Sequence, residues 1–387
     1  MKSALPLLRT LGVVVLLAAA RSAAAGPVFS NDFETGTVCH WDDAFPTVYC
    51  WSNPAGGQWT NAANWKHGSV PPNSSNIDVG IDVDGLSGTV VVSAANPVVH
   101  NVVSHASIQM DGQLFEVAGK GIFDAGLSSV AGNLEALSSG DLTVTGATNL
   151  DGGSLGANSG GHVTLASLTT ASDLSVSVGG PGGEVALPAL TSLTSTAGHA
   201  PLMILQGDGA TFSAPLLTSA SKLNVALTQG AVFSAPLLTT LDHGQISVSG
   251  ATSSFDAPDL GAIDDTQIAA AAGSISLPGV LSYKVDTSLC SLLGCWKIVA
   301  NGSGAAVSLP NLVTLTADGG SQFLKIGAIT PGAQVDLSGV TTIVTENTGT
   351  ALFEADGAGS LIDLSALTTY DNGSVSFVTT SNGVIQM

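Results

Sequence analysis

The first candidate site is a pair of aspartates, Asp336 and Asp363, which occupy the same place in two copies of a repeated apolar-x-apolar segment. Alternation along a strand turns the residue between two buried ones outward, so both carboxylates are expected on one outer face. Two carboxylates that close raise the pKa of one of them or attract a cation, and acid–base catalysis uses such groups. The alternative is a pair of solvated aspartates with no catalytic role.

A second acidic pair, Asp82 and Asp84, precedes Gly85. Alternation over residues 78–85 predicts both carboxylates on one face of a strand before a glycine turn. This is part of a calcium-loop pattern, but the distal glutamate of that pattern is missing. A weak calcium site is one interpretation, and a plain acidic turn in a protein without any cofactor is the other.

Aromatic and basic residues supply the candidate binding groups. Trp51, Trp59 and Trp65 fall close together near the N-terminus, where they either stack on sugar rings or cap the first turns of the fold. Lys297 and Lys325 recur one repeat apart, beside Trp296 and Phe323. They form either a small binding strip or two ordinary surface lysines.

The four cysteines form two local pairs, Cys39 with Cys50 and Cys290 with Cys295. Four cysteines allow three connectivities, and closure within each local pair is the simplest in an oxidising compartment. A metal site using Cys39, His40 and Cys50 is the alternative, although this spacing matches no usual zinc pattern.

A repeat positions these residues. The unit apolar-x-apolar-Pro-x-apolar recurs nine times from about residue 160, with steps of 20 to 32 residues. Alternating segments such as 174–178 and 223–227 lie between the copies, so each repeat supplies at least two short strands. Stacked units bury one continuous apolar file. The sequence therefore predicts an all-β, right-handed parallel β-helix (a β-solenoid), with less regular rungs over 86–160.

The N-terminus and the charge limit the location and the partners. Residues 1–25 combine a basic start, an apolar stretch and small residues, which is the pattern of a secretory signal peptide. We expect an aromatic N-terminal cap over 26–85 and the β-helix over 86–387, with no membrane span. After residue 25 the chain has no arginine and six lysines against 29 acidic residues. This disfavours nucleic acid as a partner and favours a monomer.

Two N-terminal segments and the repeat resemble known protein classes. Residues 28–36 followed by Trp41 resemble a segment found after the signal peptide of many bacterial exported proteins. Residues 51–65, WSNPAGGQWTNAANW, resemble the opening of bacterial surface and autotransporter-type β-helix proteins. The apolar-x-Leu-Pro-x-Leu-Thr-x-Leu unit also looks like repeats of secreted β-solenoids, including receptor L-domain-like ones. The resemblance implies an exported β-helix and transfers no catalytic residue.

Three functions remain open at this point. We expect a secreted or cell-surface protein, an adhesin or structural protein without enzyme activity, that contacts an extracellular glycan or a surface protein. The alternative is a carbohydrate-active enzyme, a polysaccharide lyase or glycoside hydrolase on a pectin-lyase-like β-helix, which uses Asp336 and Asp363. The third is a structural or water-ordering rod, suggested by recurring threonine pairs such as Thr169–Thr170 and Thr239–Thr240.

Overall fold

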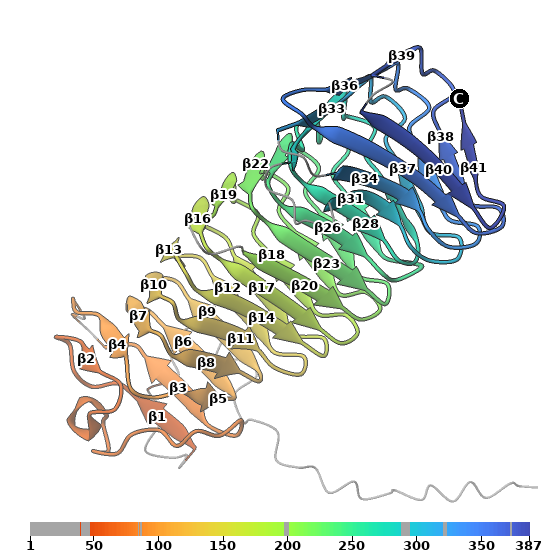
Figure 1. The fold of residues 1–387 in the computed structure, drawn as a ribbon. Coiled ribbons are helices and arrows are strands. Elements are labelled where there is room, and N and C mark those ends of the chain that lie inside the picture. The colour runs from red at the N-terminus through yellow and green to blue at the C-terminus, as the bar shows by residue number, and fades with distance from the viewer. Residues whose placement is uncertain are drawn as a thin grey trace, which may run out of the picture.

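The chain forms a parallel β-helix, seen in a computed structural model as an elongated stack of short strands (Figure 1). The structure describes residues 39, 47–83, 85, 87–196, 201–287, 295–319, 323–371 and 374–387. Each rung visits three faces in turn, and neighbouring strands within a face run parallel. The sequence predicted at least two strands in each repeat. The strand that the sequence did not reveal is the one on the second face, which has only three residues in several rungs and so shows little alternation.

The first face holds the strands that contain the repeated apolar-x-apolar unit. It consists of a ten-stranded sheet and, after a break, a five-stranded sheet. Their strands are β1 (Val48–Cys50), β3 (Asp78–Ile81), β6 (Asn101–Ser104), β9 (Lys120–Phe123), β12 (Asp141–Val144), β15 (His162–Leu165), β18 (Glu184–Ala186), β21 (Thr211–Ser213), β24 (Val232–Ser234), β27 (Ser254–Asp256), and then β29 (Ser274–Ser276), β32 (Ala306–Ser308), β35 (Gln334–Asp336), β38 (Leu361–Asp363) and β41 (Val384–Gln386).

The second face is divided into three sheets of five, four and four strands. These are β2 (Gly57–Gln58), β4 (Val90–Val92), β7 (Ile108–Asp111), β10 (Gly126–Val130) and β13 (Ala147–Asn149); β16 (Thr170–Ser172), β19 (Ser192–Thr194), β22 (Ser219–Ser221) and β25 (Thr240–Asp242); and β30 (Ser282–Asp286), β33 (Thr314–Asp318), β36 (Thr342–Thr345) and β39 (Thr369–Tyr370).

The third face is one continuous sheet of thirteen strands. They are β5 (Val98–Val99), β8 (Leu114–Val117), β11 (Asn133–Ala136), β14 (Ser154–Asn158), β17 (Ser175–Gly179), β20 (Leu202–Gln206), β23 (Asn224–Thr228), β26 (Gln245–Val248), β28 (Gln267–Ala270), β31 (Cys295–Ala300), β34 (Phe323–Ala328), β37 (Thr350–Asp356) and β40 (Val375–Thr380).

The core is a set of apolar files that run along the stack, as the repeat predicted. Ten apolar residues from the copies of the repeated unit are buried, with exposed fractions between 0% and 6%: Val185, Leu187, Phe212, Phe233, Phe255, Ile275, Val307, Leu309, Val335 and Ile362. Three successive rungs stack Phe212, Phe233 and Phe255, with ring centroids 5.2 and 4.8 Å apart. Parallel strands in register place identical side chains directly over one another, so the aromatic file extends the core without a gap.

The recurring threonines support the backbone from outside. The Oγ1 hydroxyls of Thr191, Thr218 and Thr239 each donate to the main-chain carbonyl of the threonine one rung earlier, at 3.0, 3.1 and 3.0 Å. The series is interrupted at Gly261, which cannot make this bond, and it resumes where the Thr368 hydroxyl donates to the Thr341 carbonyl at 3.1 Å. The hydrogen bond to the backbone is the simplest explanation of why threonine recurs at this position of the repeat, because the hydroxyl then has a structural role.

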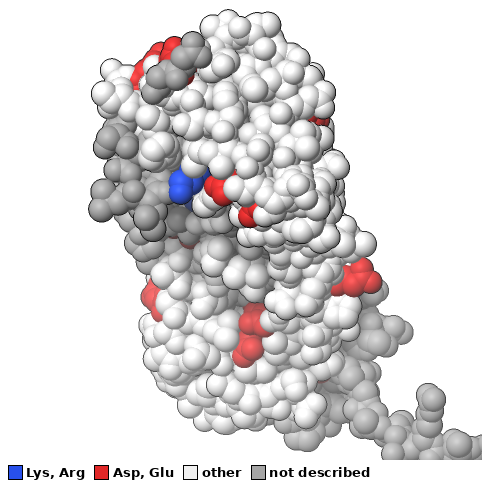
Figure 2. All heavy atoms as spheres, turned by 45° about the vertical axis from the view of Figure 1, so that its right-hand side comes forward, with Lys and Arg blue, Asp and Glu red and all other residues white. Residues whose placement is uncertain are grey.

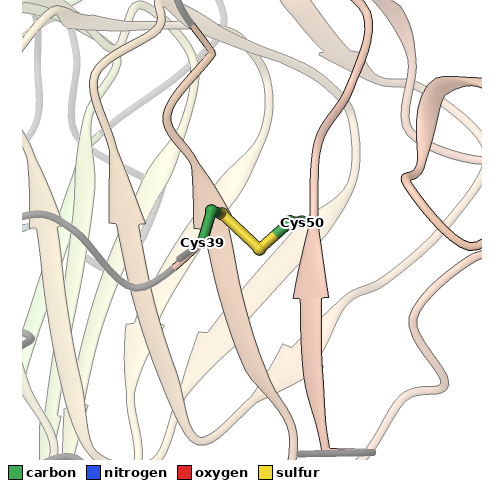
Figure 3. Close-up of a disulfide and its surroundings, with 2 residues drawn as sticks. All are labelled: Cys39 and Cys50. Carbon is green, nitrogen blue, oxygen red and sulfur yellow. A yellow bond between two sulfur atoms is a disulfide. The ribbon is translucent and has the colours of Figure 1, made fainter. Parts of the chain in front are cut away.

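The N-terminal segment continues the solenoid, because β1 and β3 lie in the first face beside β6. A short 3-10 turn, Ala62–Asn64, lies between Trp59 and Trp65. A disulfide joins Cys39 to Cys50 of β1, as the sequence predicted (Figure 3). Cys290 and the side chain of Cys295 lie outside the described residues, so their pairing stays a prediction. Among the described residues, no helix is long and apolar enough to cross a membrane.

Candidate functional site

Trp296 defines the candidate binding surface, on the outside of the third face. It lies in β31 and pairs with Lys325 of the neighbouring β34. The Lys325 ammonium Nζ lies 5.5 Å from the centroid of the Trp296 ring, which is a cation–π geometry. Trp296 is partly exposed, so its ring is accessible from outside the sheet.

Gly327 lets the tryptophan ring lie on the sheet. A Cβ atom at residue 327 would overlap the six-membered ring of Trp296. Any other residue would therefore push the ring away from the strand. The flat position of the ring depends on this glycine, which is two residues beyond Lys325 on the same strand.

Two further side chains complete this surface. Phe323, two residues before Lys325, is 41% exposed. Glu354 of β37 pairs with Gly327 and brings a carboxylate to the next strand. We call Trp296, Phe323, Lys325 and Glu354 the aromatic surface. It offers apolar ring faces together with one cation and one anion, a combination that suits a ligand with both C–H faces and hydroxyl groups.

Lys297 does not join Lys325 in a strip, contrary to one of the two expectations. The register of β31 against β34 shifts between Trp296 and Ile298, so Lys297 is the extra residue of a β-bulge. Its ammonium donates to the main-chain carbonyl of Asp265. Burial lowers the pKa of Lys297, and the nearby Asp265 carboxylate opposes this only in part. The bulge could not be seen in the sequence, where both lysines follow an aromatic or apolar residue.

Trp51, Trp59 and Trp65 lie in the core rather than on a surface, with exposed fractions of 1–2%. The Trp65 ring packs edge-on against Trp51 and Trp59, with centroids 5.1 and 4.8 Å away. Trp59 also packs against Phe115 of β8. They offer no ring face to a sugar, and they belong to the same continuous core as the rungs that follow.

Asp336 and Asp363 are brought together as expected, because they pair in register between β35 and β38. Their surroundings are those of turn residues. Asp336 accepts hydrogen bonds from the Ser308 hydroxyl at 2.7 Å and the Ser338 N–H at 3.0 Å, and Asp363 accepts one from the Ser365 N–H at 2.9 Å. Burial acts to raise the pKa of Asp336, but these hydrogen bonds outweigh it, so the pKa is lowered. The raised pKa expected of a crowded acid is not found there.

The structure describes only one member of the second acidic pair. β3 ends at Ile81, so Asp82 already lies beyond the strand, and Asp84 lies outside the described residues. The buried acid of this segment is instead Asp78, at 3% exposure. Within the described part of the chain, no group of three or more His, Cys, Asp or Glu is placed to hold a metal ion.

The structure shows an acidic pair that sequence reasoning missed. Glu116 of β8 and Glu135 of β11 pair in register on the outside of the third face. Burial, and then the Glu135 carboxylate, raise the pKa of Glu116. The Asn158 amide donates to Glu135, whose side chain lies over Gly156. The sequence did contain a signal for this pair. Residues 114–117 and 133–136 both alternate as strands do, and each segment has a glutamate at an outward position.

The face of the molecule that Figure 2 shows carries few charges. Figure 2 shows acidic residues as separate points on a largely uncharged face, with basic atoms gathered at one place beside acidic ones. Comparison of the chain with protein-family models, curated proteins and solved structures found no match.

Proposed function

We propose that this protein is a secreted or cell-surface binding protein, without enzyme activity, that attaches to extracellular glycans through the aromatic surface. The observation that carries the proposal is the partly exposed Trp296 ring, held flat on the third face by Gly327 and flanked by Lys325. The C–H face of a sugar ring packs on such an aromatic ring, while its hydroxyl groups need charged or polar partners at the edge.

The charge of the chain supports a neutral or weakly charged ligand. The formal net charge is −20, so polyanions such as nucleic acid are repelled over most of the surface. Lys325, whose ammonium lies over the Trp296 ring, and Glu354 on the next strand supply opposite charges, and each can hydrogen-bond a sugar hydroxyl. A neutral glycan uses both, whereas a polyanion would use only the lysine.

The solenoid also supports a role in attachment. A rigid stack of parallel strands presents long faces, and weak contacts repeated along a polymer add up to a strong overall attachment. The pattern of residues 1–25 indicates export, and the Cys39–Cys50 disulfide suits an oxidising compartment. Adhesion to a surface protein would use the same faces, and in the test below it would appear as a wild type that binds no glycan.

The experiment is a glycan-array screen of the exported protein, with variants Trp296→Ala and Gly327→Ala. The first removes the ring and the second displaces it, so both are expected to lose binding by at least tenfold. Leu281→Ala is the matched control, since Leu281 is 61% exposed and precedes β30 of the second face. Binding that persists in both ring variants, or a wild type that binds no glycan, would contradict the proposal.

A carbohydrate-active enzyme is the second candidate, favoured by one observation. In an acid–base pair the two carboxyl groups need different environments, one protonated and one ionised. The raised pKa of Glu116, beside a Glu135 held by Asn158, meets that requirement better than Asp336 and Asp363 do.

A further inference from the structure

A groove of about 280 Å³ lies on the outside of the second face, over the rungs of β7, β10 and β13. Residues from three successive rungs line it, among them Ser107, Ala125, Gly126, Ser128, Ala147 and Asn149. The groove is far from the aromatic surface along the stack, because β10 and β31 belong to distant rungs (Figure 1).

The absence of a side chain at Gly126 opens the floor of the groove. Gly126 has a φ of +150°, a conformation that residues with a side chain rarely adopt. A Cβ atom there would lie 3.1 Å from the carbonyl oxygen of Ala147 and 3.5 Å from the hydroxyl of Ser107. It would therefore fill the space between the two neighbouring strands.

A histidine–aspartate pair lies beside the groove. The Nδ1 of His105 is 2.5 Å from Oδ2 of Asp124, and both side chains are exposed, at 37% and 42%. His105 is two residues before Ser107, and Asp124 is two residues before Gly126, so each residue of the pair shortly precedes a lining residue along the chain. The pair is not itself part of the lining, and it can reach only the edge of the groove. When Nδ1 donates to Asp124, the other ring nitrogen, Nε2, becomes an acceptor.

The lining identifies the chemistry of a ligand. The methyl groups of Ala125 and Ala147 give the lining a small apolar part, and the hydroxyl groups of Ser107 and Ser128 and the amide of Asn149 give it polar groups. A sugar ring needs this combination, because it has C–H faces and a rim of hydroxyl groups that both donate and accept. The volume lies below the roughly 300–1,000 Å³ of sites for drug-sized molecules, so the ligand is one small unit.

We propose that this groove binds a single neutral sugar unit, with His105 and Asp124 as hydrogen-bonding partners at its edge. The site is separate from the aromatic surface and does not rest on the proposed function. The affinity expected for so small a ligand is in the millimolar range.

The test is an amide NMR titration of the protein with neutral monosaccharides and disaccharides. Shifts are expected in the rungs of residues 105–109, 124–128 and 147–149. Ala147→Leu fills the groove from its exposed side and should abolish these shifts. Ala186→Leu, at a half-buried outward alanine in β18 of the first face, is the control and should keep them. His105→Gln keeps a polar side chain and should weaken binding at least threefold.

Each outcome decides the proposal. Loss of binding in Ala147→Leu with binding kept in Ala186→Leu supports it. If Ala147→Leu unfolds, Ser128→Leu blocks the groove from the neighbouring strand and takes its place. Binding that survives the groove-filling variant, no localised shifts with any neutral sugar, or shifts only with a charged ligand or peptide would overturn it. Because Trp296→Ala leaves this groove intact, failure of the proposed function leaves the result interpretable.

Discussion

The phenolic oxygen of Tyr283 donates a hydrogen bond of 2.5 Å to the main-chain carbonyl of Thr266, and both residues are fully buried. The bond lies where the first and second faces are interrupted, between β27 and β29 and between β25 and β30. The Thr266 hydroxyl in turn donates to the Leu241 carbonyl at 2.7 Å. Together these bonds connect β25, before the break, to β30, after it.

Tyr283→Phe is expected to destabilise the protein by about 1–3 kcal/mol, because it leaves a buried carbonyl oxygen without its donor. The free energy of unfolding in urea at neutral pH measures the effect. Tyr370→Phe is the control, since Tyr370 is 38% exposed. An unchanged free energy of unfolding in Tyr283→Phe would show that the hydrogen bond to Thr266 does not stabilise the interruption of the first and second faces.

The same tyrosine predicts a sensitivity to alkaline pH. Burial, and then the carboxylates of Asp265 and Asp264, raise the pKa of Tyr283 well above its usual value. The folded state therefore holds the proton more tightly than the unfolded state, and stability falls as pH rises above the unfolded value of about 10. Tyr283→Phe cannot titrate, so the stability difference between wild type and variant should shrink above that pH. A constant difference would contradict the assignment.

The stacked file could be predicted from sequence because its signal is repeated. Phe212, Phe233 and Phe255 each precede Ser-Ala-Pro or Asp-Ala-Pro. Because the same pattern follows all three rings, the alignment of the rungs does not depend on any single copy. The break near Tyr283 could not be predicted in this way. It depends on the turn at 261–266, which occurs once and replaces a threonine by Gly261. Non-repeated hydrogen bonds leave no periodic pattern.

Phe233 should be the most sensitive position of that file, because it stacks between two other rings. Phe233→Ala is expected to cost about 3–5 kcal/mol, whereas Leu237→Ala, at a 44% exposed position in the same rung, should cost less than about 0.5 kcal/mol. Urea unfolding, monitored by near-ultraviolet circular dichroism, measures the loss of stability in both variants. Equal effects at the two positions would contradict the stacked core.

Asp78 gives a pH prediction of the opposite sign from that of a carboxylate whose pKa is lowered by hydrogen bonds or ion pairs. Burial raises its pKa, although His100 and the hydrogen bonds from Asn101 act against this. The folded state thus binds the proton more tightly, and stability falls as pH rises above the unfolded pKa of about 3.9. Asp78→Asn keeps the Oδ1 that accepts from Asn101. We expect it to be more stable than wild type at neutral pH and to lose this advantage below about pH 4.

Urea midpoints at both pH values check this, with Asp82→Asn as the control beyond the end of β3. A less stable Asp78→Asn at neutral pH would show that the ionised carboxylate is needed. Asp78→Ala should be destabilised by about 1–3 kcal/mol at either pH, because it removes the acceptor for Asn101.

The candidate sites were less predictable than the core because each depends on register. Asp336 and Asp363 were placed together correctly, since the repeat fixes that register. Trp296 against Lys325 requires the bulge at Lys297, which shifts the pairing by one residue. A single inserted residue reverses which side chains face outward, and sequence alternation alone does not reveal it.

The last prediction separates the two functions. Because the protein is proposed to bind rather than transform its ligand, wild type should release no reducing ends or unsaturated products from pectin, alginate or neutral glucans. Glu116→Gln, Glu135→Gln and the double variant Asp336→Asn/Asp363→Asn are assayed beside it. Product from wild type that is lost in the glutamate variants and kept in the aspartate variant would establish an enzyme at Glu116 and Glu135. The split environments of this pair are the reason to expect any activity there and not at β35 and β38.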